Sequence, residues 1–137
     1  MIQLIGTEEM DDYLRTSERI KDAAEKVRLR YIELLKENNL PTEGYPHVNF
    51  VKVEDSNHLL YEGDEHWSFG GHEFHRLYLP LAWLTTYDWE SEIQQCISIA
   101  RRDKAMKESR EAKEKEVKRE ESERLHLAML KAKYPNA

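Results

Sequence analysis

The sequence predicts an α+β protein with an N-terminal helix packed on a small antiparallel sheet of three or four strands, followed by a long C-terminal helix. Three observations predict this class. An apolar stripe with helical spacing covers residues 8–38, a two-residue alternation replaces it between residues 48 and 79, and the stretch 88–134 holds no Gly or Pro. We expect residues 1–100 to form an acidic α+β head. Residues 101–137 should form a charged helical arm continuous with the helix that starts near residue 88.

The first predicted helix has a marked beginning, repeat and end. Thr7 is the expected N-cap, and acidic residues follow it in the first turn. Apolar residues then recur every seven positions, at Tyr13, Ile20, Val27 and Leu34. The run Asn38-Asn39-Leu40-Pro41 ends the helix, because Asn tolerates a left-handed cap and Pro blocks continuation. This helix should cover one face of the sheet, since a small sheet is not stable alone.

Four short strands are predicted in the middle of the chain. They are residues 48–53, 58–62, 65–69 and 72–79. The expected turns are Asp55-Ser56-Asn57, Gly63-Asp64 and Gly70-Gly71. The short connections favour an antiparallel meander.

The long C-terminal helix divides into three parts by composition. Trp89, Ile93, Cys96 and Ile97 form an apolar stripe that should dock on the head, so we expect Cys96 to be a buried packing residue rather than a nucleophile. Residues 101–124 are almost entirely charged, and the tip is apolar again. Three arrangements remain open: a dimer or larger assembly through this helix, which the apolar tip favours, a single projecting helix, and a helix that folds back.

Charge separates the two halves of the chain. Residues 1–100 carry 9 Lys and Arg against 19 Asp and Glu, whereas residues 101–137 carry 12 against 8. An acidic head disfavours phosphate contacts, so nucleic acid is not an expected partner, and a basic protein surface fits better. The chain has no apolar run of transmembrane length and no basic, signal-like start, and its single cysteine excludes an internal disulfide. A cytoplasmic location is expected.

The best candidates for chemistry are His66, His72 and His75, because imidazole is a common metal ligand. His72 and His75 are three apart on a predicted strand, however, and should therefore face opposite sides. The run from His72 to His75 also lacks one residue of the metalloprotease spacing. We therefore expect surface histidines, no cofactor and no catalytic residues.

Partner contacts are expected at two places. The first is the aromatic and acidic hairpin region, with Asp64, Glu65, Trp67 and Phe69. The second is the apolar tip of the long helix, with Leu125, Leu127, Met129 and Leu130.

A resemblance adds to this interpretation. The run Trp67-Ser68-Phe69-Gly70-Gly71-His72-Glu73-Phe74, followed by Leu79-Pro80, Trp83-Leu84 and Asp88-Trp89-Glu90, resembles a pattern in small uncharacterised bacteriophage accessory proteins. The resemblance implies a protein made in the host cytoplasm during infection that binds and blocks a host protein, for example a defence nuclease.

The leading hypothesis is therefore a non-enzymatic protein-binding module, an inhibitor or adaptor that acts on a host protein. The first alternative is a structural homo-oligomer assembled through the long helix. The second alternative is a metal-dependent enzyme that uses the three histidines.

Overall fold

The computed structural model describes residues 2–135 and confirms the predicted α+β class. Its helices are α1 (Thr7–Glu37), α2 (Ala82–Thr85) and α3 (Trp89–Lys133). The strands are β1 (Asn49–Glu54), β2 (His58–Trp67) and β3 (Gly71–Pro80), and two short 3-10 turns are η1 (Tyr45–His47) and η2 (Ser68–Gly70). The chain divides into two compact units: the first ends at Ile97 and the second begins at Ser98.

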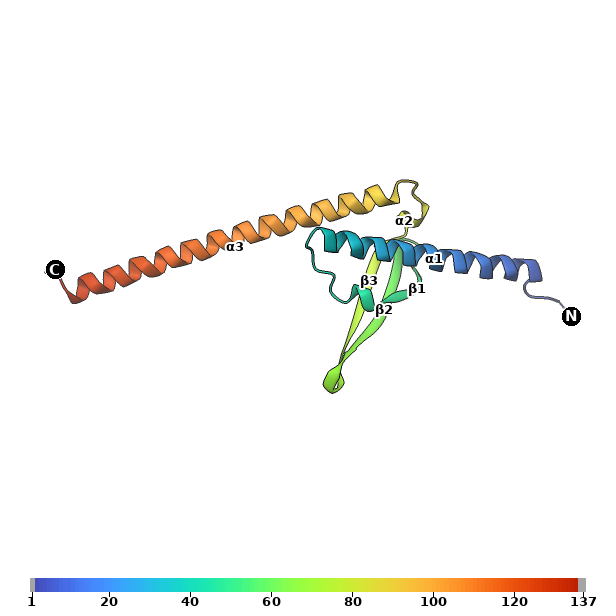
Figure 1. Ribbon diagram of the computed structural model, residues 1–137, viewed down its shortest axis with the longest axis horizontal. Helices are drawn as coiled ribbons and strands as arrows, with labels where there is room; N and C mark the ends of the chain where they lie inside the picture. Colours follow the sequence, from blue (N-terminus) through green and yellow to red (C-terminus); the bar gives the residue numbers. More distant parts are fainter. Residues whose placement is uncertain (1, 136–137) are drawn as a thin grey trace. The chain divides into compact units, whose positions relative to one another are not determined.

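The sheet is an antiparallel meander in the order β1-β2-β3. Pairing of β1 with β2 ends at Asn49 and Glu62, whereas β2 and β3 stay paired as far as Trp67 and Gly71. The β2–β3 hairpin therefore continues beyond the end of β1 as a two-stranded ribbon, residues 63–67 and 71–75. This ribbon extends away from α1 (Figure 1).

The predicted turn at Gly63-Asp64 was wrong, because β2 runs through both residues without a break. Gly63 is needed for packing instead. A Cβ atom at this position would overlap the backbone carbonyl of His47, so only glycine lets η1 approach the strand this closely.

The hairpin turn also differs from the prediction, which placed Phe69 in a strand before a Gly70-Gly71 turn. The turn is Ser68–Gly70, and Gly71 already belongs to β3. Phe69 and Gly70 both adopt positive φ, at 73° and 78°. The register between β2 and β3 determines the position of the turn, because Trp67 pairs directly with Gly71 and only residues 68–70 remain between them.

The hydrophobic core lies between the sheet and the C-terminal half of α1. Its buried members on α1 are Ala24, Val27, Ile32, Leu34 and Leu35. The sheet contributes Leu59, Leu60, Tyr61, Leu77 and Leu79. The Tyr61 hydroxyl donates a hydrogen bond of 2.6 Å to the Ala24 carbonyl, and burial raises the pKa of Tyr61 well above its ordinary value.

The N-terminal half of α1 lies outside this core. Met10, Tyr13 and Leu14 are exposed, although Tyr13 belongs to the predicted seven-residue stripe. A helix of 31 residues is about 46 Å long, which exceeds what a three-stranded sheet can cover. The helix also begins one residue earlier than predicted, since Gly6 and not Thr7 is the N-cap.

A polar cluster joins α1 to the sheet edge. Glu25 accepts hydrogen bonds from Arg28 at 2.7 and 3.1 Å through Oε2 and from the Phe50 backbone N–H at 2.9 Å through Oε1. Arg28, which is buried, also donates to the Tyr45 carbonyl at 2.9 Å. One ion pair thus links α1 to both β1 and η1.

The first turns of α3 belong to the head, as predicted. Ile93 and Ile97 are buried, and Arg30 of α1 lies 3.5 Å from Glu90. The expected burial of Cys96 was wrong: this residue is exposed. A helix turns by about 100° per residue, which places Cys96 beside the buried Ile93–Ile97 stripe rather than within it.

The rest of α3 presents its side chains to solvent. Every residue from Arg101 to Pro135 is exposed. Pairs such as Arg119 with Glu116 and Glu123, at 2.5 and 3.4 Å, support the helix locally. Within residues 2–135, no helix combines the length and the apolar character needed to cross a membrane.

Candidate functional site

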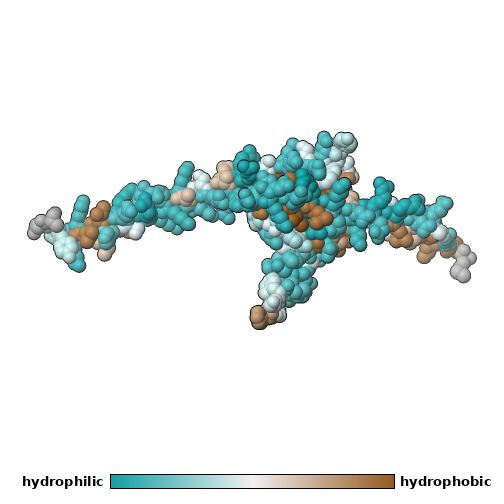
Figure 2. All heavy atoms as spheres, in the orientation of Figure 1, coloured by the Kyte–Doolittle hydropathy of each residue, from teal (hydrophilic) through white to brown (hydrophobic). Residues whose placement is uncertain are grey.

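The β2–β3 ribbon carries three exposed aromatic residues, of which Trp67 and Phe69 lie at its tip and Phe74 lies near its base. Trp67 is 52% exposed, Phe74 is 50% exposed and Phe69 is fully exposed. The hydropathy surface shows the apolar tip of this ribbon at a distance from the rest of the head (Figure 2). Trp67 lies over the backbone of Gly71, where a Cβ atom would overlap its indole. The Arg76 guanidinium lies 5.5 Å from the centre of the Phe74 ring.

Phe69 is unusual because its backbone conformation and the exposure of its ring are both unfavourable for the isolated protein. With φ of 73° and ψ of 24°, it occupies the left-handed region, where Asn, Asp and Gly are preferred. A residue with a Cβ atom in this region costs about 1 kcal/mol. Its ring is also left entirely in water. Strain together with an exposed large apolar side chain indicates a contact residue.

The predicted acidic partners of these aromatics lie on opposite faces of the ribbon. Asp64 is directly across from Phe74 and is exposed. Glu65 is across from Glu73, on the face that continues the core side of Tyr61 and Leu77. The structure therefore places Asp64 on the face of Phe74, whereas Glu65 shares the face of Trp67 and is turned towards η1.

The three predicted histidines do not form one group. His66 and His72 are directly opposite each other with ring centres 5.6 Å apart, whereas His75 lies on the other face. This is the separation that strand alternation predicted for His72 and His75. His75 instead contacts Glu65, its Nε2 lying 2.8 Å from Oε2 of the carboxylate.

A fourth histidine, which the sequence interpretation missed, completes a different set. His47 of η1 lies 3.4 Å from Glu65, and its ring centre is 6.4 Å from that of His75. Glu73 lies 3.9 Å from His75. We call His47, Glu65, Glu73 and His75 the His–Glu cluster. The glycines Gly44 and Gly63, which lie against His75 and His47, are the only trace of this cluster in the sequence, and their role can be recognised only in the fold.

Two glycines hold the His–Glu cluster in place. A Cβ atom at Gly44 would overlap the His75 ring, and one at Gly63 would overlap the His47 carbonyl. The close packing at these two glycines leaves only 14% of the His75 side chain exposed. The cluster is therefore a packed junction between η1, β2 and β3 rather than a chance meeting of surface side chains.

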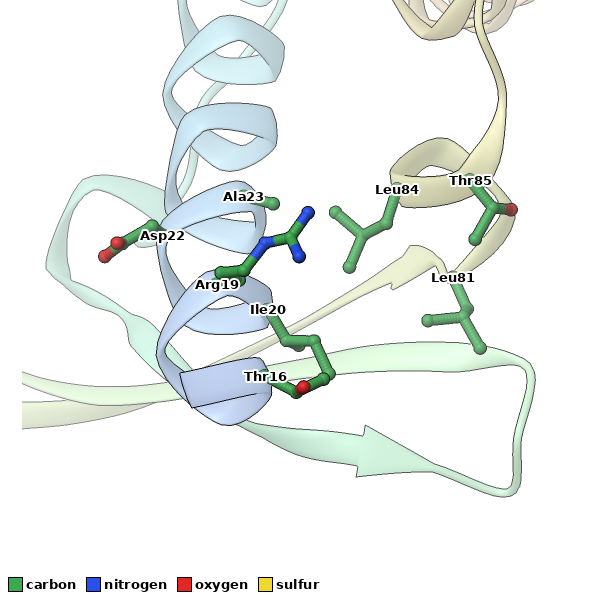
Figure 3. A pocket seen from close by; sticks show the side chains of 8 residues that line it. All are labelled: Thr16, Arg19, Ile20, Asp22, Ala23, Leu81, Leu84 and Thr85. Carbon is green, nitrogen blue, oxygen red and sulfur yellow. The ribbon is translucent and has the colours of Figure 1, made fainter. Parts of the chain in front are cut away.

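A separate shallow pocket lies between α1 and the α2 region and has a volume of about 540 Å³. Leu81 and Leu84 face Ile20 and the Arg19 stem across it, while Asp22 points to another side of the helix (Figure 3). Its lining is mostly apolar, and its charged members are Arg19 and Asp22.

The other predicted contact region, at the end of α3, is exposed. Leu125, Leu127, Met129 and Leu130 are 66%, 56%, 71% and 41% exposed. Leu125 and Met129 share one side of the helix by their four-residue spacing, and Leu127 and Leu130 share another. The apolar character thus extends around more than one side, as the sequence indicated.

Comparisons with family models, with curated proteins and with solved structures gave no match. The class of the protein therefore rests on its own features: an α+β head that presents an aromatic hairpin tip, joined to a charged helix.

Proposed function

We propose that this protein is a non-enzymatic protein-binding module that uses the tip of the β2–β3 hairpin as its anchor. The observation that supports this most is Phe69, a fully exposed aromatic ring on a left-handed backbone. Aromatic residues at the centre of an interface supply a large share of binding energy. The adjacent Trp67 provides a second aromatic surface.

The partner that fits this tip has an apolar pocket with basic groups around it. Asp64 and Glu73 are exposed within a few residues of Phe69, and the first hundred residues carry an excess of acidic side chains. Charges of this sign would steer a basic surface towards the tip and repel nucleic acid. The partner in this proposal is a host protein, and binding would inhibit it or connect it to another component.

The replacement Phe69→Asn should stabilise the fold and weaken partner binding at the same time. Asn suits the left-handed turn, so the free energy of unfolding should rise by about 1 kcal/mol. Loss of an interface anchor should weaken binding by about 30-fold, the equivalent of about 2 kcal/mol. Urea unfolding measures the first effect. A variant that loses both stability and binding would contradict the proposal.

The partner can be captured with a photo-crosslinking phenylalanine analogue at position 69. The matched control carries the same analogue at Tyr87, which is 97% exposed in the loop before α3. In a bacterial lysate, position 69 should give one dominant protein adduct that excess unlabelled protein suppresses and excess Phe69→Asn protein does not. Identical adducts from both positions would argue against a binding role of the tip.

Assembly through α3 is a second candidate function, and one observation favours it. The last turns of this helix expose four large apolar side chains, a feature that single soluble helices rarely keep without a partner. In this proposal a second copy of the chain covers them, and the long helix is the assembly element.

Replacing Leu127 and Leu130 by Gln should convert such an assembly into a monomer. Replacing Met106 and Val117 by Gln is the matched control, because both are exposed apolar residues of the same helix outside the tip. Light scattering at micromolar concentration should give a multiple of 16.3 kDa for the parent chain and the control, and 16.3 kDa for the tip variant. A parent chain that is already monomeric excludes this candidate.

A further inference from the structure

We propose that the His–Glu cluster binds a divalent transition-metal ion, with Zn²⁺ as the best fit, through His47, Glu65, Glu73 and His75. This site is distinct from the three-histidine set that the sequence suggested, and it does not depend on the proposed role of the hairpin tip.

Two like charges face each other within the cluster. Glu65 and Glu73 are direct cross-strand partners in β2 and β3. Like charges placed opposite each other destabilise a strand pair. This pair also lies in a ribbon that has no third strand to support it. A cation between the two carboxylates would turn this repulsion into attraction, with His75 beside both of them as a third ligand and His47 as the candidate fourth.

The ligand atoms of the cluster lie close to the spacing that a zinc ion requires. Zinc binds imidazole nitrogen and carboxylate oxygen at about 2.0–2.2 Å, so tetrahedral ligand atoms lie roughly 3.4 Å apart. Here His47 Nε2 is 3.4 Å from Oε1 of Glu65, whereas His75 Nε2 is 2.8 Å from Oε2 of Glu65 and 3.9 Å from Oε2 of Glu73. One ligand atom each from Glu65, Glu73 and His75 lies within 4.8 Å of the others. His47 lies outside this group, with its ring centre 6.4 Å from that of His75, so it must move towards the other three ligands to complete the coordination.

The backbone holds the four side chains close together before any ion binds. The four ligands come from three segments, η1, β2 and β3, which Gly44 and Gly63 allow to pack closely. The side chains of Glu65 and His75 are mostly shielded, at 32% and 14% exposure. His47 and Glu73 are more open, at 46% and 62%, and provide the side from which an ion enters.

The choice of metal follows from the ligand types. Two imidazoles and two carboxylates match Zn²⁺ and neighbouring first-row ions, whereas Mg²⁺ and Ca²⁺ prefer sites made of oxygen alone. A bound ion would connect η1 to both strands at the base of the ribbon that carries Trp67 and Phe69. It would therefore order the hairpin without taking part in any reaction.

The test is metal binding by the full-length protein after chelator dialysis. Competition with a chromophoric chelator should show one equivalent of Zn²⁺ bound, and Co²⁺ should produce the visible absorption of a tetrahedral site. Glu73→Gln and His75→Gln should each weaken Zn²⁺ binding by at least about tenfold. Zn²⁺ at a concentration that just saturates the parent chain should raise its melting temperature, and should raise that of Glu73→Gln by less.

The matched control is the double variant His66→Asn and His72→Asn, which removes the two histidines on the opposite face of the same ribbon. Its Zn²⁺ affinity should stay within twofold of the parent value. Because the Glu73 side chain is largely exposed, Glu73→Gln decides the question even if His75→Gln unfolds. Absence of stoichiometric binding by the parent chain overturns the proposal. So does a Zn²⁺ affinity that is unchanged in Glu73→Gln, or one that is lost in the control.

Discussion

Replacement of Ile93 by Ala should lower the free energy of unfolding by about 3 kcal/mol. Ile93 is completely buried, although it belongs to a helix whose later part is entirely exposed. Truncation of a large aliphatic side chain at such a position removes its transfer free energy and leaves a cavity that the neighbours fill only in part. The effect should be large for a small head, since a domain of this size is stable by only about 5–15 kcal/mol.

The matched control is Ile99→Ala, six residues further along the same helix. Ile99 is 52% exposed and lies beyond the division of the chain at Ile97, so its replacement should change stability by less than about 0.5 kcal/mol. Both variants replace Ile by Ala in the same helix, α3. Urea unfolding followed by tryptophan fluorescence measures the head, because Trp83 is buried there. Equal losses in the two variants would show that the core extends past Ile97.

The elements of this fold could be predicted because each is encoded by local patterns. The seven-residue stripe of α1, the alternation of the strands and the uninterrupted helix formers of α3 act within a few residues of one another. The partial coverage of α1 could not be predicted in this way. Whether Tyr13 is buried depends on the extent of the sheet beneath it, which no local pattern records.

Two of the differences from the prediction arise from packing or pairing between segments distant in sequence, and the third arises within one helix. Gly63 looked like a turn residue, but it is a strand residue that makes space for the His47 carbonyl. Phe69 looked like a strand residue because aromatic residues favour strands, yet the pairing of Trp67 with Gly71 places it in the turn. Cys96 was assigned to the buried side although it lies next to that side.

The candidate sites were also predictable only where they depend on a local pattern. Strand alternation alone was enough to predict that His72 and His75 face opposite sides. Alternation did not predict the position of Phe69, which it placed in a strand and the structure places in the turn. The inclusion of His47 required the path of residues 41–48 over the sheet, because this histidine reaches Glu65 only through the close approach of η1. A site assembled from three segments is visible only once the fold is known.

Replacement of Glu25 by Ala should destabilise the head by about 3 kcal/mol, far more than a surface ion pair contributes. Glu25 bonds at once to Arg28 and to the Phe50 backbone N–H, and Arg28 is itself buried. Removal of the carboxylate would leave a buried positive charge and a backbone donor without their partner. Loss of one member of a buried pair typically costs 3–5 kcal/mol, because the remaining charge stays desolvated.

The control is Glu33→Ala, which breaks an ion pair with Arg30 at 2.9 Å on the same helix and with the same three-residue spacing. Glu33 is more than half exposed, so its replacement should cost less than about 0.5 kcal/mol. Combining Glu25→Ala with Arg28→Met should recover part of the loss, because the second change removes the isolated charge. If the double variant is as unstable as the sum of the single variants, the hydrogen bonds to Phe50 and Tyr45 contribute the stability, and the charge pair does not.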